Sequence, residues 1–589
     1  MKRIGWLFGS LGLVFAAIGA LAGAQEPAFD QAWQKVQSAR ATARGQWSNP
    51  KLTQDELKKV TADLEALKAF CLRPEIRNLK AADGSQLVYF QRNDILVDLI
   101  ICYGKLGDRE RVVTSAEELR DSLTGEDSWI IKENKLSMFS FYANRIASMP
   151  EVIALLPDPR ITKVIGDLRR RDPDWMLAGI PYPGGDTDKI TAGDRIAGLS
   201  MIWSEAKYNF ANWDLVSGLD WDGTYRQFIP RVAKEQSRYE YYDLLREFMA
   251  LLKDAHTDLG LPESLRNSME VRIPLPIRRV QDHVVIWREP SPSLAKFGFR
   301  AGDVIETIDG VPAIEYGQRK WGKLVSSSTP QGHDVNLYTY MLLRGPKTKK
   351  VVLGVEHADG TKQAITVRRD KPLSGVMTPP FEFKILADGT AYFAFNTCNN
   401  DVPALSFERL LPEIRKAGRL IIDVRLNEGG NSGVGASILS HLVDRDLKVG
   451  KWETRNYRPS FRAWDRASDR YGEEETLFAS ADKFTGPVAV ICGPRTFSAA
   501  EDFLCYYRAS GRGKLVGMPT GGSTGQPMRF NLPGGGWARI CTKRDRNADG
   551  TEFVGVGFVP DIRADSTVED IRAGRDPALA AAQRVVNGG

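Results

Sequence analysis

Short, largely apolar runs in the second half of this 589-residue chain constrain its fold more than any other feature. Leu420–Val424 and Val488–Cys492 are typical of strands that are buried on both faces. Stretches with apolar residues at helical spacing, Leu405–Lys416 and Ala499–Ala509, alternate with these runs. Strands that alternate with helices predict an α/β core with parallel strand pairing, here over residues 375–565.

The rest of the chain is predicted to be helical at first and then rich in β-strands. Apolar residues recur at helical spacing in Leu52–Phe70 and Leu87–Leu106, and Pro181–Gly185 breaks that pattern. Strand patterns begin at Val271. We therefore expect a multidomain α+β protein. Its predicted parts are a signal peptide at 1–24, a helical N-terminal domain at 25–185, a helical segment at 186–265, a β domain at 266–372, the α/β core at 375–565 and a helical tail at 566–589.

The N-terminus has the pattern of a secretory signal peptide. Lys2 and Arg3 precede the apolar stretch Ile4–Leu21, and Ala22-Gly23-Ala24 then forms a small-x-small cleavage site. A membrane-spanning helix is the alternative for this stretch. No later stretch is apolar enough to span a membrane. The sequence predicts an exported protein without a membrane span after cleavage, either periplasmic in a Gram-negative host or secreted.

Composition excludes several classes of function. The formal net charge is +6, from 80 Lys and Arg against 74 Asp and Glu, without a basic run or a Gly-rich phosphate loop, so no nucleic-acid partner is expected. Six cysteines are too few for a disulfide scaffold. Cys71 and Cys102 are either a disulfide pair or two buried thiols. Asp545–Gly550 fits half of a calcium loop, but Val556 stands where a glutamate is needed. A polar hairpin turn is therefore favoured, and no metal or cofactor is expected.

Ser498 is the candidate nucleophile. It lies in Thr496–Glu501, between a buried strand and a helix. A serine at a helix N-terminus lies where free N–H groups and the helix dipole favour developing negative charge. The alternative is purely structural, because Ser-x-x-Glu is also a capping box.

A glycine loop and a histidine complete the candidate set. Gly429 and Gly430 follow a strand end, so their bare backbone can approach a ligand closely. A serine nucleophile needs a base, and the chain has five histidines. His256 ends a predicted helix, where it is either a base or a helix C-cap. His441 is the next candidate.

Taken in order, these segments resemble the tail-specific (C-terminal processing) serine proteases. The matching segments are Asp254–Thr257, the small β domain, Asp423–Gly430, Thr496–Glu501 and Gly555–Asp561. The resemblance covers about Gly193–Asp565 and implies a core similar to the crotonase and Clp-protease superfamily. It also implies that the β domain is PDZ-like, since Gly298–Ile305 is similar to the PDZ stretch before the ligand groove. PDZ domains bind an extended C-terminal peptide as an added strand, so Phe299 is expected to contact substrate. Gly429, in the glycine loop, is expected to contact it as well.

The resemblance also implies catalytic roles. One branch of the family uses a lysine after the nucleophile, but Gly517–Pro527 contains none. The tricorn-like branch uses a histidine, and His256 matches it as the base for Ser498. Backbone N–H groups of Gly430 and Ala499 would then form the oxyanion hole.

A further role is that of the residue that orients His256. The tricorn-like branch has a hydroxyl residue beside the histidine, but this chain has Ala255. We expect Glu552 to orient the ring, with Asp254 as the next candidate. The expected activity is serine endopeptidase cleavage of proteins or peptides. The alternative is a catalytically inactive PDZ-containing protein that binds peptides.

Overall fold

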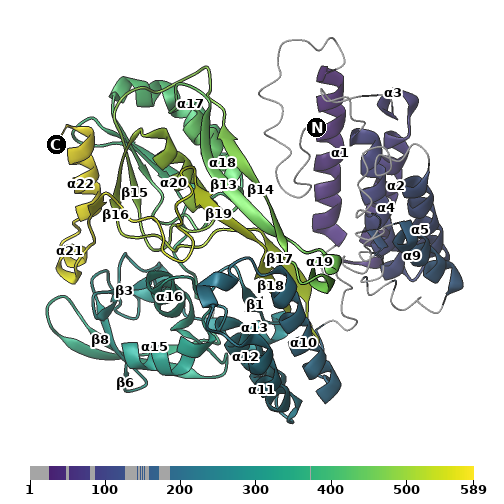
Figure 1. Cartoon of the computed structure of the whole chain (residues 1–589), viewed down its shortest axis with the longest axis horizontal. Helices are drawn as coiled ribbons and strands as arrows, with labels where there is room; N and C mark the ends of the chain where they lie inside the picture. Colours follow the sequence, from purple (N-terminus) through teal and green to yellow (C-terminus); the bar gives the residue numbers. More distant parts are fainter. Residues whose placement is uncertain are drawn as a thin grey trace. The chain divides into compact units, whose positions relative to one another are not determined.

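The computed structural model describes most of the chain. The described residues are 26–47, 52–77, 79, 87–125, 158–171, 186–371 and 373–588, with a few single positions between 139 and 152. The expected signal peptide and the Pro181–Gly185 segment lie outside them. Residues 11–183 make up one compact unit, and 184–589 make up the bulk of a second (Figure 1).

The first unit is helical over its described residues, as predicted. Its helices are α1 (Glu26–Trp47), α2 (Gln54–Cys71), α3 (Pro74–Arg77), α4 (Leu87–Leu106), α5 (Arg109–Thr124) and α9 (Pro159–Arg171). A capping box at Thr53 and Glu56 starts α2. Both Cys71 and Cys102 are thiols buried in the hydrophobic core of this unit, which is the second of the two alternatives.

The second unit opens with helices that pack on a small sheet. The helices are α10 (Ala192–Asn209), η1 (Trp213–Val216), α11 (Trp221–Ala233), α12 (Arg238–Ala250) and α13 (Glu263–Met269). The sheet has the order β1 (Asp258–Gly260), β18 (Trp537–Cys541) and β17 (Pro527–Asn531), and all its pairs are antiparallel. The helices and the sheet share one core, in which Phe248 and Leu245 of α12 lie with Ala538 and Ile540 of β18. The sheet therefore joins the start of this unit to its end.

A β domain follows in the chain, as predicted. Its antiparallel sheet has the order β3 (Ile277–Val280), β4 (His283–Ile286), β5 (Val304–Ile308), β8 (Lys350–Glu356) and β9 (Lys362–Arg368), and β6 (Val311–Pro312) pairs with β5. β2 (Val271–Arg272) pairs with β7 (Arg344–Gly345). Its helices are α14 (Pro292–Ala295), α15 (Ala313–Trp321), η2 (Gly322–Leu324), α16 (Pro330–Asp334) and the π-helical turn η3 (Val335–Met341).

The α/β core is a six-stranded sheet. Its order is β10 (Phe381–Ile385), β11 (Ala391–Phe395), β12 (Leu420–Asp423), β15 (Val488–Cys492), β16 (Gly513–Gly517) and β20 (Ile562–Arg563). Every pair is parallel except β10 with β11. The predicted parallel core is therefore correct.

Helices cover both faces of this sheet. On one face Ile422 and Val490 pack against α17 (Val402–Ala417), α18 (Ser432–Ser440) and α20 (Ala499–Ser510). On the other face Ile421 and Ala489 pack against α22 (Pro577–Val586), which follows α21 (Val568–Arg572) (Figure 1). Neighbouring residues along each strand thus lie in different cores, which is why the strand sequences are continuously apolar.

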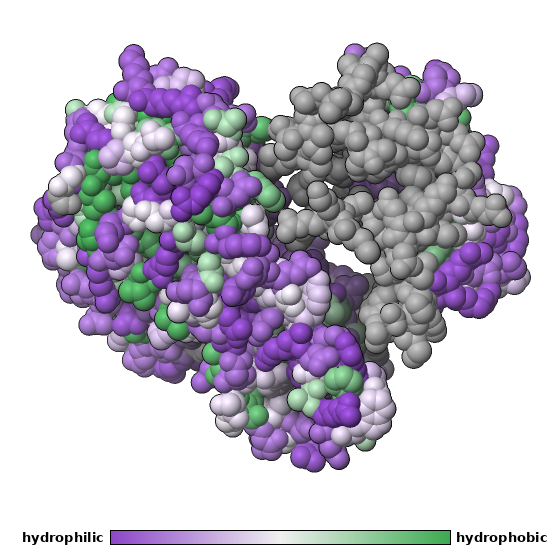
Figure 2. Space-filling view, turned by 45° about the horizontal axis from the view of Figure 1, so that its top comes forward, coloured by the Kyte–Doolittle hydropathy of each residue, from purple (hydrophilic) through white to green (hydrophobic). Residues whose placement is uncertain are grey.

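One further sheet has no counterpart in the sequence prediction. Its order is β14 (Asp469–Leu477), β13 (Leu447–Asn456) and β19 (Lys543–Asn547), with α19 (Pro459–Ala463) between β13 and β14. Hydrophilic residues predominate among the coloured atoms in Figure 2, and hydrophobic ones are interspersed. Within the described ranges, no helix is both long and apolar enough to cross a membrane.

Candidate active site

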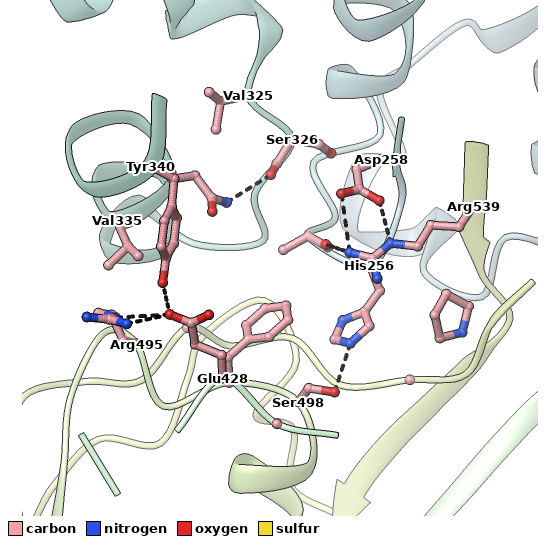
Figure 3. Close-up of a pocket in the computed structure, with 18 of the residues that line it drawn as sticks. His256, Asp258, Val325, Ser326, Val335, Tyr340, Glu428, Arg495, Ser498 and Arg539 are labelled. Atoms are coloured by element: carbon pink, nitrogen blue, oxygen red, sulfur yellow. Dashed lines mark hydrogen bonds and ion pairs between the residues drawn. The ribbon is translucent and has the colours of Figure 1, made fainter. Parts of the chain in front are cut away.

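Ser498 lies on a sharp turn between β15 and α20. Its backbone has φ 57° and ψ −128°, a conformation that non-glycine residues rarely adopt. Its side chain makes no hydrogen bond to the start of α20, so the capping-box alternative is wrong. The hydroxyl instead lies 3.0 Å from Nε2 of His256 (Figure 3). Ser498 is only half-buried, so its hydroxyl faces a cavity that a substrate can enter.

His256 is buried beside this serine. It follows α12, and its backbone N–H donates to Oδ1 of Asp254 at 2.9 Å. Its ring stacks on Phe497 with centroids 4.7 Å apart. Burial, together with the positive charges of Arg539 and Lys543, lowers the pKa of His256 to about 3. The imidazole is therefore neutral near pH 7, as a general base must be.

Strand pairing holds His256 in place. β1 begins two residues after it, and Asp258 pairs with Arg539 of β18 both in register and as an ion pair. Thr257 Oγ1 accepts a hydrogen bond from the backbone N–H of Cys541 at 3.0 Å. At Gly260, a Cβ would lie 2.2 Å from the Trp537 ring, so only glycine allows this pairing. His256 is thus held by the pairing of β1 with β18, a strand that lies far downstream in the chain.

The loop after β12 passes directly over the nucleophile. Gly429 and Gly430 have φ of +93° and +136°, in the region that favours glycine. A Cβ on Gly429 would lie 2.6 Å from the Cβ of Ser498, and one on Gly430 would lie 2.4 Å from the carbonyl carbon of Cys398. Among the described residues, no acceptor is found for the N–H groups of Gly430 and Ala499. Both groups are free to bind a ligand beside Ser498.

A cavity of about 640 Å³ contains Ser498 and His256. The β domain contributes Val325, Val335 and Tyr340 to its wall, and the core contributes Gly429 and Gly430. In Figure 3, Tyr340 points across the cavity to a carboxylate of the core. That carboxylate, Glu428, accepts hydrogen bonds from Tyr340 and from Arg495. The cavity is thus bounded by two parts of the chain and is large enough for a peptide segment.

Glu552 does not reach His256, contrary to the expectation from sequence. Its carboxylate pairs with Nε of Arg544 at 3.0 Å and with Nε of Arg546 at 2.6 Å. Both arginines belong to β19, and their positive charges hold the carboxylate there. The Nδ1 atom of His256 lies instead 2.8 Å from the hydroxyl of Ser523. The sequence reasoning missed Ser523, because it examined that loop only for lysine.

Two other predicted positions lie away from the nucleophile. Phe299 is buried in the hydrophobic core of the β domain with 1% of its surface exposed. It does not line the cavity at Ser498. His441 directly follows α18, with its Nδ1 2.6 Å from the carbonyl oxygen of Asp482. Neither residue is placed to act on a ligand at Ser498.

The acidic stretch at 545–550 spans the end of β19 and the turn that follows it. Asp545 pairs with Lys543 at 2.6 Å. Asp549 accepts hydrogen bonds from the backbone and hydroxyl of Thr551. These contacts engage the carboxylate of Asp545 in β19 and that of Asp549 in the turn after it.

Fold and site together define a serine-type peptidase with an α/β core. Comparison with known proteins agrees. Residues 390–564 match the model of peptidase family S41, and residues 199–250 match the Tricorn protease C1 domain. Residues 390–564 are thus a domain of peptidase family S41, and the relatives found for this chain are C-terminal processing proteases.

Similar proteins have corresponding names. A chloroplastic C-terminal processing peptidase of Tetradesmus obliquus is 24% identical over 343 residues, which are 56% of this chain and 69% of that protein. A carboxyl-terminal-processing protease of Picosynechococcus sp. is 24% identical over 378 residues, which are 62% of this chain and 80% of that protein. Mature CPAF complexed with lactacystin has a TM-score of 0.54 at 15% identity, covering 68% of this chain and 99% of that one. This last likeness shows a shared fold.

Proposed function

We propose that the protein is an exported serine endopeptidase that uses Ser498 as nucleophile and His256 as general base. The 3.0 Å contact between Ser498 Oγ and His256 Nε2 carries the proposal. The depressed pKa of His256 supports it, because only the neutral ring can accept a proton. The export part of the proposal rests on the sequence of residues 1–24.

The proposed first step is acylation of Ser498. As its Oγ attacks the carbonyl carbon of the scissile bond, its proton moves to Nε2 of His256. The carbonyl oxygen becomes an oxyanion, which accepts hydrogen bonds from the N–H groups of Gly430 and Ala499. When the C–N bond breaks, the imidazolium returns the proton to the leaving amine. Water then releases the acyl group by the same route.

A fluorophosphonate probe tests this proposal, because it labels only an activated serine. We expect labelling of the wild type and none of Ser498→Ala or His256→Ala. Each of these variants should lose turnover of a fluorogenic peptide by about 10⁴- to 10⁶-fold, since residues of one catalytic unit act together. His441→Gln is the matched control, since it replaces another buried histidine and should be labelled normally. An unlabelled wild type would instead favour the inactive peptide-binding protein.

We further propose that the β domain, with boundaries at 266–372, is a PDZ-like module that captures substrate chain ends beside a crotonase-like core. Its antiparallel sheet has edge strands that an extended peptide can join. Deleting the domain is a poor test, because the hydroxyl of its Ser328 accepts a hydrogen bond from the backbone N–H of Ala255, which precedes His256. A better test compares two long substrates that differ only in a free or amidated C-terminus. Faster cleavage of the free form supports capture of chain ends, and equal rates contradict it.

A further inference from the structure

The ring of His256 has two hydroxyl partners, and the mechanism above uses only one. Ser523 Oγ lies 2.8 Å from Nδ1, on the side of the ring away from Ser498. Ser523 is 0% exposed, so bulk water does not compete for this contact. We propose that Ser523 positions the catalytic histidine by accepting its Nδ1–H, which leaves Nε2 unprotonated and directed at Ser498. This inference rests on the proposed function.

A neutral imidazole carries one N–H, and the partner of that N–H decides which nitrogen is the base. The nearby carboxylates are engaged elsewhere. Asp254 accepts from the backbone of His256 and from Asn212, and Asp258 pairs with Arg539. Within the described part of the chain, Ser523 is therefore the side chain placed to hold Nδ1.

Ser523 is fixed to the same helix as the nucleophile. Glu501, one turn into α20, accepts hydrogen bonds from the backbone N–H groups of Gly522 and Ser523, each at 2.8 Å, and from the hydroxyl of Thr520. The backbone N–H of Ser498 donates to the carbonyl oxygen of Ser523 at 3.1 Å. The hydroxyls of Ser498 and Ser523, which lie on either side of the His256 ring, are thus held at a fixed distance from each other.

A hydroxyl orients the ring without adding a negative charge. The imidazolium formed during attack keeps its Nδ1–H bond to Ser523, but no carboxylate stabilises the charge through that bond. Removing Ser523 should therefore cost less than removing a catalytic aspartate. Loss of orientation should lower kcat, whereas KM should change little, because Ser523 contacts the base and not the substrate.

Steady-state kinetics on a short fluorogenic peptide test this role. We expect Ser523→Ala to lower kcat by about 10- to 100-fold, at or below the lower end of the roughly 10²- to 10⁴-fold that general acid–base catalysis contributes, with KM within about twofold. Ser523→Thr keeps the hydroxyl and should restore most of kcat. Ser510→Ala is the matched control, because it removes a serine hydroxyl from the other end of α20 and should leave kcat unchanged. Wild-type kcat in Ser523→Ala overturns the proposal.

A spectroscopic test covers the case in which Ser523→Ala does not fold. The ¹⁵N signals of the ring distinguish protonation at Nδ1 from protonation at Nε2, and His256→Gln identifies the signals of this histidine. We expect the wild type and Ser523→Thr to carry the proton on Nδ1. A proton on Nε2 in the wild type overturns the proposal, because Ser523 would then be the donor.

Fluorophosphonate labelling separates this inference from the proposed function. If the wild type is not labelled, the proposed peptidase chemistry fails, and the role of Ser523 fails with it. If the wild type and Ser523→Ala are labelled at equal rates, only the role of Ser523 fails. Slower labelling of Ser523→Ala at unchanged thermal stability supports both.

Discussion

At the residue scale, the surroundings of His256 set it apart from the other histidines. Burial is the largest cause of its lowered pKa, and Arg539 and Lys543 contribute with the same sign. The ordinary value of 6.5 marks where an exposed imidazole becomes charged. Because the lowered pKa keeps the ring neutral well below that pH, the site should tolerate acid.

We therefore expect kcat/KM for a short peptide to stay constant as the pH falls through 6.5 and to decline only at lower pH. Only the neutral ring accepts the proton of Ser498. Arg539→Gln removes a positive charge, so the pKa of His256 should rise and the decline should move to higher pH. The profile is measured from about pH 8 down to about pH 3, with circular dichroism to monitor the fold. A decline centred on 6.5 in the wild type contradicts this prediction.

Glu552→Gln should leave turnover within about twofold of the wild type, because its carboxylate pairs with Arg544 and Arg546 and not with His256. The free energy of unfolding should fall by less than about 1 kcal/mol, as for other partly exposed ion pairs. Peptide turnover and chemical denaturation measure the two effects. A large loss of kcat at unchanged stability would restore Glu552 to the catalytic set.

Gly429→Ala should abolish labelling and turnover. Its new methyl group would lie 2.6 Å from the Cβ of Ser498, at a backbone φ of +93°. Gly418→Ala is a matched control, because Gly418 also has a positive φ but has open space around it at the end of α17. That variant should lose about 1 kcal/mol of stability and keep its activity. Activity in Gly429→Ala would show that the loop moves away from Ser498.

The sequence predicted Ser498 and His256, but it did not predict Ser523, which contacts the other nitrogen of the His256 ring. Ser498 and His256 lie in recognisable local patterns, and the structure brings them together. Ser523 was not predictable, because its position depends on the hydrogen bonds that Glu501 makes to the loop. The expectation for Glu552 failed because the arginines of β19 were not recognised as its partners.

At the scale of elements, β1 connects the histidine to the core. It has only three residues, yet it pairs with β18 along its whole length. The ring of Trp537 occupies the space that a side chain at Gly260 would need. A small change at Gly260 should therefore shift His256, four residues earlier in the chain, and so affect catalysis.

We expect Gly260→Ala to lower kcat by about tenfold or more, because the Cβ would displace either Trp537 or β1, and displacement of β1 shifts His256. Gly218→Ala is the control, since nothing lies within 4 Å of a Cβ there. Turnover and the rate of fluorophosphonate labelling should fall together in Gly260→Ala. Unchanged rates would mean that the His256 segment is held without β1.

Elements with one strong pattern were predictable, and those without one were not. The strand β15 is a continuous apolar run and β12 is apolar apart from Asp423, and the turn between β17 and β18 contains several glycines. The long hairpin of β13 and β14 was missed. Residues 469–476 of β14 are polar or small apart from one tyrosine and are mostly exposed, so neither alternation nor an apolar run marks the strand.

At the scale of the whole molecule, the first unit has a core of its own. The residues of that core lie between Ala32 and Leu168. Ser498, His256 and the partners described for them all lie in the second unit. Catalysis should therefore depend on the second unit alone.

A chain of residues 184–589 should fold and cleave a short fluorogenic peptide with kcat/KM within about threefold of the full chain, because no part of the described site is removed. The kcat/KM values of the shortened and the full chain are compared at a temperature at which thermal unfolding shows both to be folded. A folded but inactive chain would show that residues before 184 contribute to catalysis. In that case the helical unit would need a functional explanation.

The pairing of β1 with β18 also determines when activity appears. It joins residues 281 positions apart, and the reacting pair itself is separated by 242. Contacts at such separations form late, because the entropy of closing a long loop opposes them. During synthesis the histidine leaves the ribosome long before β18 has been made. The newborn chain therefore has no assembled catalytic pair, and it acquires its ability to cut proteins only when nearly all of its own sequence has been made.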